Sequence, residues 1–518
     1  MKRSLTSSLS ILLLILSSAS VALAAKHVPG DVLVVLEGEG GSRVSASSLH
    51  MGREAFRVAS IAASSGAWVK DTWPQLSEAG GGVFALLHTD VRSADRLVEE
   101  LQARPDVLAA SPNYIVRVAA MPDDPLSPAN ELWGLRDIRA PEAWDVTTGR
   151  RDVHVAIIDT GIDWTCPDLA ARVEHRLSRG FTTKDETAYM DDNGHGTHVA
   201  GIVGAAGDNG TGLVGTAWDV GLIALKAMDS KGEGRISDVI AAIDHLVGLL
   251  RADPGLKIAA VNLSLETYSP MAPTFEAQVR EPLWRALKAL DDMNGTLIVV
   301  AAGNYGVEVG APVPSDASDG TYDEGDYAYL ASYGGLDGKI AVAAMGQDGR
   351  VAPFSNWSPT HVELAAPGVE IWSTFSLSAP WTEDLKFRAF SLDDGTRVGI
   401  AKGTSMAAPH VAGAAALLMA ADPTRTAWQI KASLMHGADG TRCRDAAAWG
   451  ALDVRGALDH QAAHPDLSAT PPPSRYDDYE QYEPYEYEER KERGGTGCDA
   501  VGQPGGLLLA WALLRRRR

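Results

Sequence analysis

The chain has 518 residues, 45% of them hydrophobic, which is enough apolar material for more than one folded domain. Acidic side chains outnumber basic ones by 67 to 46, giving a formal net charge of -21. This excess argues against nucleic acid as a partner, because phosphate binding needs a concentrated positive surface. A well-solvated surface is the simpler interpretation.

The N-terminus has the pattern of an export signal. Lys2 and Arg3 precede an apolar run at 11–16, and small residues follow as far as Ala24. The run is too short to cross a bilayer, and its A-x-A ending is a cleavage pattern. We therefore predict a signal peptide at 1–24 and a secreted or extracellular protein, with transient anchoring at the cell surface left open.

Residues 25–120 mix strand and helix patterns over the length of a small domain. Ser93 is placed to cap a helix in which Leu97 and Leu101 share one face. A domain of this size with mixed elements is predicted to be α+β. Strand patterns occur at 31–36, 83–87, 107–108 and 114–116.

A Pro- and Asp-rich stretch at 122–128 marks a turn or linker. Beyond it, buried-type strand runs alternate with helical patterns, which favours a parallel sheet covered by helices on both faces. In such folds the active groups gather at the carboxyl ends of the strands. The strand patterns are 153–158, 221–225, 258–261 and 296–300, and the helical patterns are 236–250 and 282–291.

The composition changes again after residue 462. Residues 463–496 hold a triple proline and a Tyr/Glu/Asp tract with almost no aliphatic side chains, which predicts an extended acidic linker without a core. Residues 497–518 end in a short apolar run followed by four arginines. That run is too short for an ordinary transmembrane helix.

Three cysteines occur, and an odd number leaves at least one thiol without a partner inside the chain. A Cys166–Cys443 disulfide is left open by the sequence, and no metal-ligand spacing links these residues with Cys498.

A glycine-rich turn leading into an alanine-rich helix places Ser405 at a helix N-terminus. Backbone N–H groups and the helix dipole favour developing negative charge there, but a serine hydroxyl needs a base to become a good nucleophile. His195 can accept a proton near neutral pH, and Asp159 at a strand end can orient it. Asn304 ends another strand, where its amide can donate to an oxyanion.

Each of these side chains also has a structural interpretation. Asp159 can close an Asx-turn, and Asn304 tolerates a left-handed turn. His195 and His198 are three apart and could bind a metal, but no further ligand has metalloprotease spacing and no Glu follows His195. A buried structural histidine explains His198 better.

The order Asp159, His195, Ser405 and the residues around them resemble the subtilisin-like serine proteases, the S8 family. The resemblance covers about residues 122–460. Three motif segments carry it, namely 157–163, 195–201 and 403–413, and residues 302–304 match the family's oxyanion-hole segment.

The resemblance implies peptide-bond hydrolysis through an acyl-enzyme. Ser405 would be the nucleophile, His195 the general base and then acid, and Asp159 the residue that orients His195. Asn304 and the Ser405 backbone N–H would hold the oxyanion. The implied protein is a monomeric endopeptidase that acts on proteins or peptides and needs no cofactor for catalysis.

The implied fold is α/β, a subtilisin-like parallel sheet with helices on both faces at 121–462. Residues 25–120, above all their ending at 111–116, resemble the family's ferredoxin-like propeptide, which inhibits the enzyme until self-cleavage. We place that cleavage between about Arg117 and Asp124; a retained N-terminal domain is the alternative.

The tail at 497–518, with its Gly497-Cys498 pair, resembles the C-terminal sorting tails of myxobacterial and related Gram-negative surface proteins. That resemblance implies a sorting protease as a partner. An amphipathic end that contacts lipid is the alternative.

Two departures from the family pattern concern the substrate site. Ser264, Leu265 and Glu266 match the segment flanking the S1 pocket, where the third residue is usually glycine. Glu233 and Gly234 fall near S2 and S4, where many members carry a small residue instead of Glu233. Two carboxylates would favour basic side chains in the substrate, whereas a Glu266 turned to solvent would not.

Asp168 and Asn209 fall near ligand positions of the family's structural calcium site, and oxygen ligands on loops suit this cation. Asp208 is the alternative to Asn209, because the loop length differs there.

Two other functions remain open. One is a surface protein that binds peptides on the same scaffold without cutting them, which the intact catalytic positions disfavour. The other is a narrow processing protease that matures exported proteins.

Overall fold

The computed structural model describes residues 27–38, 48–72, 82–114, 122, 124–126, 131–269, 273–314, 325–376, 388–392 and 395–469. The predicted signal peptide, the C-terminal tail and the linker beyond residue 469 lie outside the described residues.

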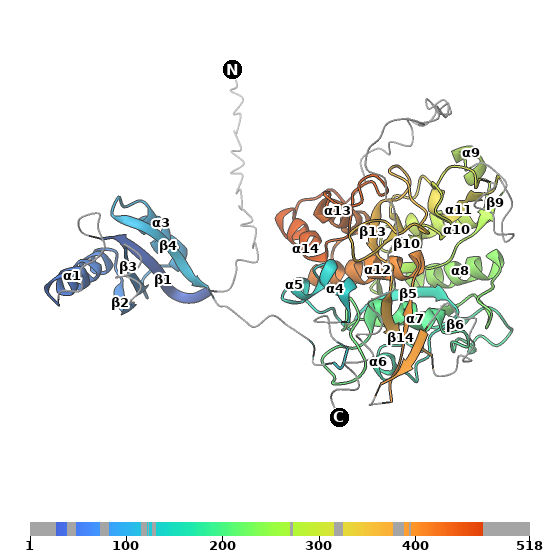
Figure 1. Cartoon of the computed structure of the whole chain (residues 1–518), viewed down its shortest axis with the longest axis horizontal. Helices are drawn as coiled ribbons and strands as arrows, with labels where there is room; N and C mark the ends of the chain where they lie inside the picture. Colours follow the sequence, from blue (N-terminus) through green and yellow to red (C-terminus); the bar gives the residue numbers. More distant parts are fainter. Residues whose placement is uncertain are drawn as a thin grey trace, which may run out of the picture. The chain divides into compact units, whose positions relative to one another are not determined.

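The first part of the described chain is an antiparallel sheet with helices α1 and α3 (Figure 1). Its strand order is β2-β3-β1-β4, and the elements follow one another as β-α-β-β-α-β, which is the ferredoxin-like arrangement. The predicted α+β fold is therefore confirmed. The elements are β1 (His27–Glu37), α1 (Ser48–Ser64), β2 (Trp68–Thr72), β3 (Gly82–His88), α3 (Ala94–Gln102) and β4 (Val107–Tyr114).

Every second side chain of β1 points into the core of this domain. Val32, Val34 and Leu36 are buried in one cluster with Leu97 of α3. The predicted cap of α3 is present, since the Ser93 hydroxyl accepts a backbone N–H of the first turn. The domain thus has a hydrophobic core of its own.

Two details of this domain differ from the sequence prediction. A single strand, β4, covers 107–114 where two short strands were expected, and residues 115–116 lie outside the described part. Helix α1 and strand β2 were not predicted at all.

The second part of the described chain is built on a seven-stranded parallel sheet of order β13-β12-β10-β8-β5-β7-β6 (Figure 1). Strand β5 lies inside the sheet, with β7 and the edge strand β6 on one side and β8, β10, β12 and β13 following in chain order on the other, so the direction of progress through the sheet changes between β5 and β8. A crevice forms at the carboxyl ends of the strands at such a point. The strands are β5 (Val153–Asp159), β6 (Arg179–Gly180), β7 (Gly221–Lys226), β8 (Lys257–Leu263), β10 (Leu297–Ala301), β12 (Lys339–Met345) and β13 (Leu364–Pro367).

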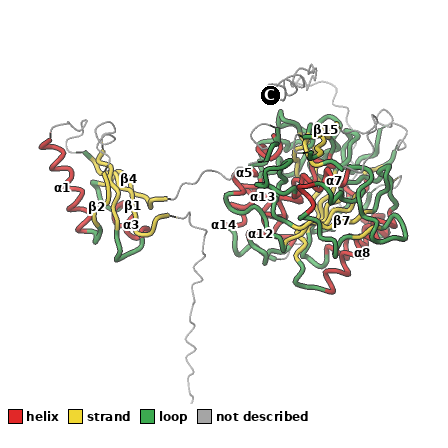
Figure 2. The backbone as a smooth tube through the Cα atoms, turned by 90° about the horizontal axis from the view of Figure 1, so that it is seen from below, coloured by secondary structure: helices red, strands yellow, loops and turns green. Residues whose placement is uncertain are grey.

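Helices cover both faces of this sheet, as predicted. Val155 and Ile157 of β5 belong to a core cluster with helices α7, α12, α13 and α14, whereas Ala156 and Ile158 belong to a second cluster with α8 and α10. Figure 2 shows α8 and α12 on different sides of the strands. The helices are α7 (His195–Gly204), α8 (Ile236–Ala252), α10 (Pro282–Asp291), α12 (Thr404–Ala421), α13 (Ala427–Gly437) and α14 (Val454–Ala463).

Shorter elements surround this framework. Strand β9 (Tyr268–Ser269) pairs with β11 (Tyr327–Ala328), and β16 (Arg397–Ala401) pairs with β14 (Ile371–Thr374) and β15 (Arg388–Ser391). The short helices are α4 (Trp133–Asp137), α5 (Ala140–Trp144), α6 (Pro167–Ala170), α9 (Phe275–Gln278) and α11 (Tyr329–Ser332).

Helix α12 is the one described helix long and apolar enough to cross a membrane by length and composition. Within the fold, 89% of its apolar window is buried against the sheet and neighbouring helices. It is a core helix by its packing.

The disulfide left open by the sequence is not formed, because neither Cys166 nor Cys443 is part of a disulfide bond. They belong to different core clusters, on opposite faces of the sheet. The Cys166 thiol donates to the carbonyl oxygen of Phe375 at 3.4 Å, and the Cys443 thiol donates to the carbonyl oxygen of Gly349 at 3.4 Å.

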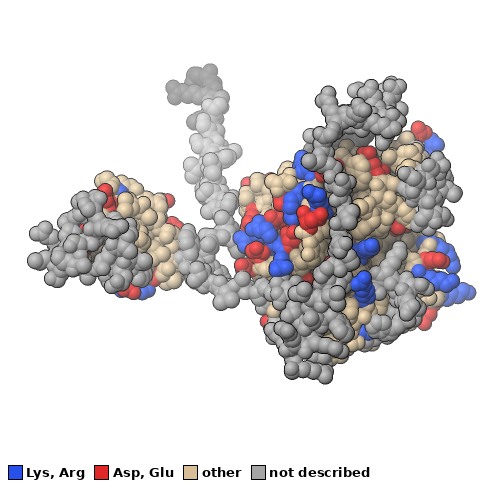
Figure 3. Space-filling view, in the orientation of Figure 1, with Lys and Arg blue, Asp and Glu red and all other residues tan. Residues whose placement is uncertain are grey.

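Charged side chains of both signs are interspersed on the face of the molecule shown in Figure 3. Ion pairs also form within the second part of the chain, for example Arg172–Asp219 and Arg442–Asp137. This mixed surface fits the solvated surface expected from the composition.

Candidate active site

Asp159 and His195 form a hydrogen-bonded pair at the carboxyl edge of the sheet. Asp159 is the last residue of β5 and is fully buried, while His195 begins α7. His195 Nδ1 lies 2.8 Å from Oδ1 and 3.0 Å from Oδ2 of Asp159. A carboxylate at that nitrogen favours the tautomer with hydrogen on Nδ1, so Nε2 is left as the proton acceptor.

A second buried carboxylate, that of Asp191, fixes the loop before His195. Its Oδ1 accepts the N–H groups of Asn193 and Gly194 at 2.9 Å and the Thr160 hydroxyl at 2.9 Å. Its Oδ2 accepts the N–H of Thr197 at 2.9 Å and also the Thr197 hydroxyl. Asp191 therefore ties the residue after Asp159 to the first turn of α7.

Ser405 lies in the first turn of α12, next to the segment that follows β8. Its hydroxyl donates to the carbonyl oxygen of Ser264 at 3.2 Å, and the Ser264 hydroxyl donates to the carbonyl oxygen of Ser405 at 2.9 Å. His195 contacts Asp159 at the end of β5 and Ser405 contacts Ser264 just after the neighbouring parallel strand β8, so α7 and α12 begin at the same edge of the sheet. The nucleophile candidate and the histidine are thus presented by neighbouring helix N-termini.

Asn304 is oriented by the residue before Ser405. Asn304 Oδ1 accepts the Thr404 N–H at 2.8 Å and the Thr404 hydroxyl at 3.2 Å. With its oxygen engaged in this way, the amide Nδ2 is the group that can donate to a substrate. Sequence reasoning found Asn304 but missed Thr404 as its anchor.

The predicted substrate-site residues fall into two groups. Ser264, Leu265 and Glu266 follow β8 directly beside Ser405, and Glu266 Oε2 accepts the Asn304 N–H at 3.1 Å. The carboxylate of the half-buried Glu266 is therefore directed at the Asn304 backbone. Glu233 is exposed, and its backbone closes a loop with Asp229.

Gly234, the last of these residues, forms an antiparallel bridge with Met228, which closes the same exposed loop.

His198 takes the structural role expected of it. Its Nε2 lies 3.1 Å from the carbonyl oxygens of Ile371 and Gly399, and burial lowers its pKa to about 3. It stays neutral at physiological pH and links α7 to strands β14 and β16.

Asp168 and Asn209 come together with a carboxylate that the sequence did not single out, Asp124. Asn209 Nδ2 donates to Asp168 Oδ1 at 3.2 Å, and Asp124 Oδ2 accepts the Asp208 N–H at 2.9 Å. Both Asp124 and Asp168 are buried. Burial raises the pKa of Asp168 to about 6, and the Asp124 charge adds to this effect.

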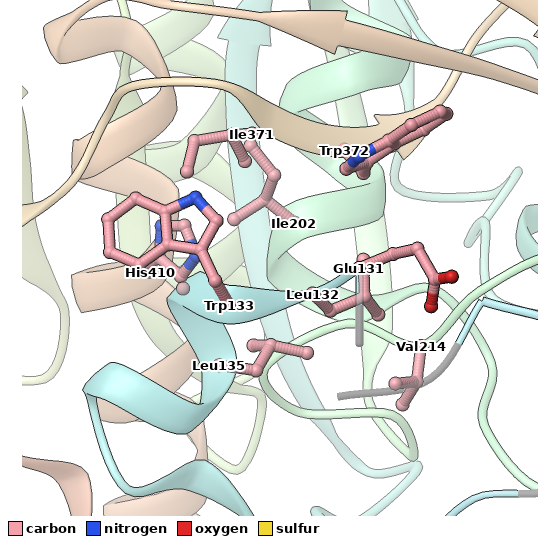
Figure 4. Close-up of a pocket in the computed structure, with 10 residues that line it drawn as sticks. Glu131, Leu132, Trp133, Leu135, Ile202, Val214, Ile371, Trp372 and His410 are labelled. Carbon is pink, nitrogen blue, oxygen red and sulfur yellow. The ribbon is translucent and has the colours of Figure 1, made fainter. Parts of the chain in front are cut away.

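A small pocket lies further along α7 and α12, between α4, Ile202 of α7 and His410 of α12 (Figure 4). Its walls are mostly apolar and include Trp133 and Trp372. None of the site residues described above lines this pocket. Its one histidine, His410, is neutral at physiological pH, because burial lowers the pKa of its side chain to about 4. This pocket is therefore separate from the place where a peptide would be cut.

A serine at a helix N-terminus and a histidine held by a carboxylate, both at the carboxyl edge of a parallel sheet, define a serine hydrolase of the α/β class. The chain matches the model of the subtilase family, Peptidase_S8, over residues 150–488. It therefore belongs to that family and is a subtilisin-like serine endopeptidase.

Three relatives illustrate the similarity. The chain is 33% identical to "Thermophilic serine proteinase" of Bacillus sp. (strain AK1), over 67% of this chain and 72% of that protein. It is 32% identical to thermitase of Thermoactinomyces vulgaris, over 61% and 91% of the two chains. It is 31% identical to subtilisin E of Bacillus subtilis (strain 168), over 69% and 77%.

Proposed function

We propose that Ser405, His195, Asp159 and Asn304 carry out the peptidase reaction. The observation that supports this most is the 2.8 Å contact between His195 Nδ1 and Asp159, at the edge of the sheet where α12 begins with Thr404 and Ser405. The Ser405 hydroxyl turns from the Ser264 carbonyl to His195 Nε2 and gives up its proton as Oγ attacks the substrate carbonyl.

The buried Asp159 carboxylate stabilises the imidazolium that results. Asn304 Nδ2 and the Ser405 backbone N–H donate to the oxyanion of the tetrahedral intermediate. His195 then returns the proton to the leaving amine, which leaves an acyl group on Ser405. Water activated by His195 releases that acyl group and restores the enzyme.

Substitution of single residues tests these roles. Ser405→Ala should abolish casein hydrolysis and labelling by a serine-directed inhibitor, whereas Asn304→Ala should lower kcat by about 100-fold or more with little change in KM. Full activity in Ser405→Ala would overturn the mechanism.

We further propose that the enzyme is exported as a zymogen in which residues 25–120 are the inhibitor. The domain has its own core, and the sheet face opposite its helices carries the partly exposed apolar side chains of Leu33, Val35 and Phe84. Such a face is suited to pack against another surface. The partner would be the enzyme's own peptidase part.

Comparison of the exported wild-type chain with Ser405→Ala tests self-processing. The wild-type chain should acquire a new N-terminus between about Arg117 and Asp124, and the variant should keep residues 25–120 attached. Cleavage of both proteins at the same site would show that another protease matures the enzyme.

A structural calcium ion is proposed at Asp168, Asn209 and Asp124. The described residues hold no group of three or more His, Cys, Asp or Glu side chains suited to a metal, so amide and carbonyl oxygens would have to complete the ligand set. One observation supports the fit: the two carboxylates are buried near enough for the Asp124 charge to raise the pKa of Asp168, and a cation between them would offset this repulsion.

Calcium should raise the melting temperature of the Ser405→Ala protein, and a chelator should lower it. Asp168→Asn should remove this dependence. An equal melting temperature with calcium and with chelator would count against the site.

We also propose that residues 497–518 are a sorting tail removed by another protease after export, so that the enzyme stands briefly on the cell surface. Mass spectrometry of the mature protein should then show a C-terminus before Arg518. An intact Arg518 on the secreted enzyme would refute this.

A further inference from the structure

Glu266 places a carboxylate between the two chain segments that flank Ser405. Two residues before it, Ser264 makes two hydrogen bonds with Ser405, one through its hydroxyl and one through its carbonyl oxygen. On the other side, Glu266 Oε2 accepts the backbone N–H of Asn304 at 3.1 Å. The segments after β8 and β10 therefore meet at this side chain.

Both segments are held firmly, so the carboxylate has a defined position. Asn262 Nδ2 donates to the Ser264 hydroxyl at 2.8 Å. The fully buried Asn356 donates to the Ala302 carbonyl at 3.0 Å and accepts the N–H of Tyr305 at 3.0 Å. A charge in this setting is pre-organised for a ligand.

The space beside Gly303 shows how closely Glu266 approaches the site. A Cβ on Gly303 would lie 3.1 Å from Glu266 Oε2 and 3.0 Å from the Tyr268 hydroxyl. The N–H that Glu266 accepts is neutral, so this hydrogen bond leaves the formal charge of the carboxylate in place. A negative charge therefore stands at the wall formed by residues 264–266 and 303–304.

The substrate side chain nearest to this wall is the one on the acyl side of the cut bond. Its Cα is bonded to the carbonyl carbon that Ser405 attacks, so it must lie beside the segments that hold Ser405 and Asn304. A lysine or arginine there can extend its cation toward Glu266, whereas an aliphatic side chain would leave the carboxylate poorly solvated.

We propose that Glu266 makes this enzyme selective for lysine or arginine on the acyl side of the cleaved bond. The inference rests on the proposed roles of Ser405 and Asn304. It assigns the selectivity to Glu266 and not to Glu233, which is exposed on the loop closed by Asp229. Such an enzyme would suit the processing of exported proteins at basic residues.

The test uses one peptide series that differs only at the acyl-side residue, which is arginine, citrulline, lysine or leucine. Citrulline has nearly the shape of arginine without its charge, so the ratio of the two kcat/KM values isolates the electrostatic effect. We expect the wild-type enzyme to cut the arginine peptide about tenfold faster or more, because two opposite charges at a protein edge attract more strongly than in water.

Glu266→Gln keeps an oxygen that can accept the Asn304 N–H but removes the charge. It should bring the arginine-to-citrulline ratio close to one and leave cleavage after leucine unchanged or improved. Glu233→Gln is the matched control, and it should leave the ratio as in the wild type.

Two results would overturn the inference: a wild-type ratio near one, or a loss of kcat in Glu266→Gln that is equal for all four peptides. The second result would make Glu266 a positioning residue for Asn304. Binding of the same peptides to the Ser405→Ala protein separates this question from catalysis. There the arginine peptide should bind about tenfold more tightly than the citrulline peptide, even if the proposed mechanism proved wrong.

Discussion

Replacing Asp191 with asparagine should disturb both the stability of the enzyme and the geometry of His195. The Asp191 side chain is fully buried and accepts hydrogen bonds from five donors, two of them on Thr197. An asparagine has a single acceptor oxygen, and its NH2 group would face donors. If the oxygen keeps the position of Oδ1, the buried Thr197 N–H loses its partner.

A buried donor left without a partner costs about 1–3 kcal/mol, and the opposed NH2 group adds to this, so we expect a loss of about 2–4 kcal/mol in the free energy of unfolding. Activity should fall as well, because Asp191 links Thr160, next to Asp159, to the first turn of α7. A small displacement of His195 is expected to lower kcat by about 10- to 100-fold with little change in KM.

Denaturant unfolding in the Ser405→Ala background, where self-digestion is absent, measures the stability, and peptide hydrolysis in the active enzyme measures kcat. Asp185→Asn is a matched control, because Asp185 accepts the N–H and hydroxyl of Thr187 in the same way on the exposed surface. The control should leave the unfolding midpoint unchanged. If the two substitutions behaved alike in both assays, the role given to Asp191 would be refuted.

Three further results are expected. Gly196→Ala should abolish activity, because the new Cβ would lie 2.1 Å from a carbonyl oxygen in the loop after β5. Gly248→Ala is its control: the new Cβ would have no atom within 4 Å, so the substitution should stabilise α8 by about 0.5–1 kcal/mol. Burial and two neighbouring histidines lower the pKa of His460 to about 4, below its unfolded value near 6.5, so stability should fall as the pH drops through this range. His460→Gln should make the melting temperature less dependent on pH there. Cys166 and Cys443 should both react with a thiol reagent after unfolding without reductant, and a reductant should leave the melting temperature unchanged.

The sequence predicted β5, β7, β8 and β10 of the large sheet, which are runs of β-branched and aliphatic residues, but it missed the alanine-rich strands β12 and β13 and the two-residue strand β6. It failed at β4, in which two alanines, a serine and Pro112 interrupt the pattern. That strand forms because β1 is long enough to pair with it on one side, with a bulge near Val35. Pro112 is tolerated because β4 is an edge strand, where a residue without a backbone N–H need not interrupt the hydrogen bonds between strands.

The candidate site was predictable to the extent that it lies at strand ends and helix starts. Asp159 ends β5, the segments of Ser264 and Asn304 follow β8 and β10, and these strands are neighbours in the sheet. Parallel strands bring their carboxyl ends to one edge, so a sequence pattern is enough to bring such residues together.

What the pattern could not supply is the direction of a side chain once it reaches that edge. Glu266 could point to solvent or to the nucleophile, and the choice is made by a backbone N–H of residue 304, which lies 38 positions away in the chain. Asp191 shows the same dependence, since its carboxylate also takes the hydroxyl of Thr160 from another motif. Residue types therefore identify the reaction, whereas selectivity for one substrate over another depends on hydrogen bonds between segments that only the folded chain brings together.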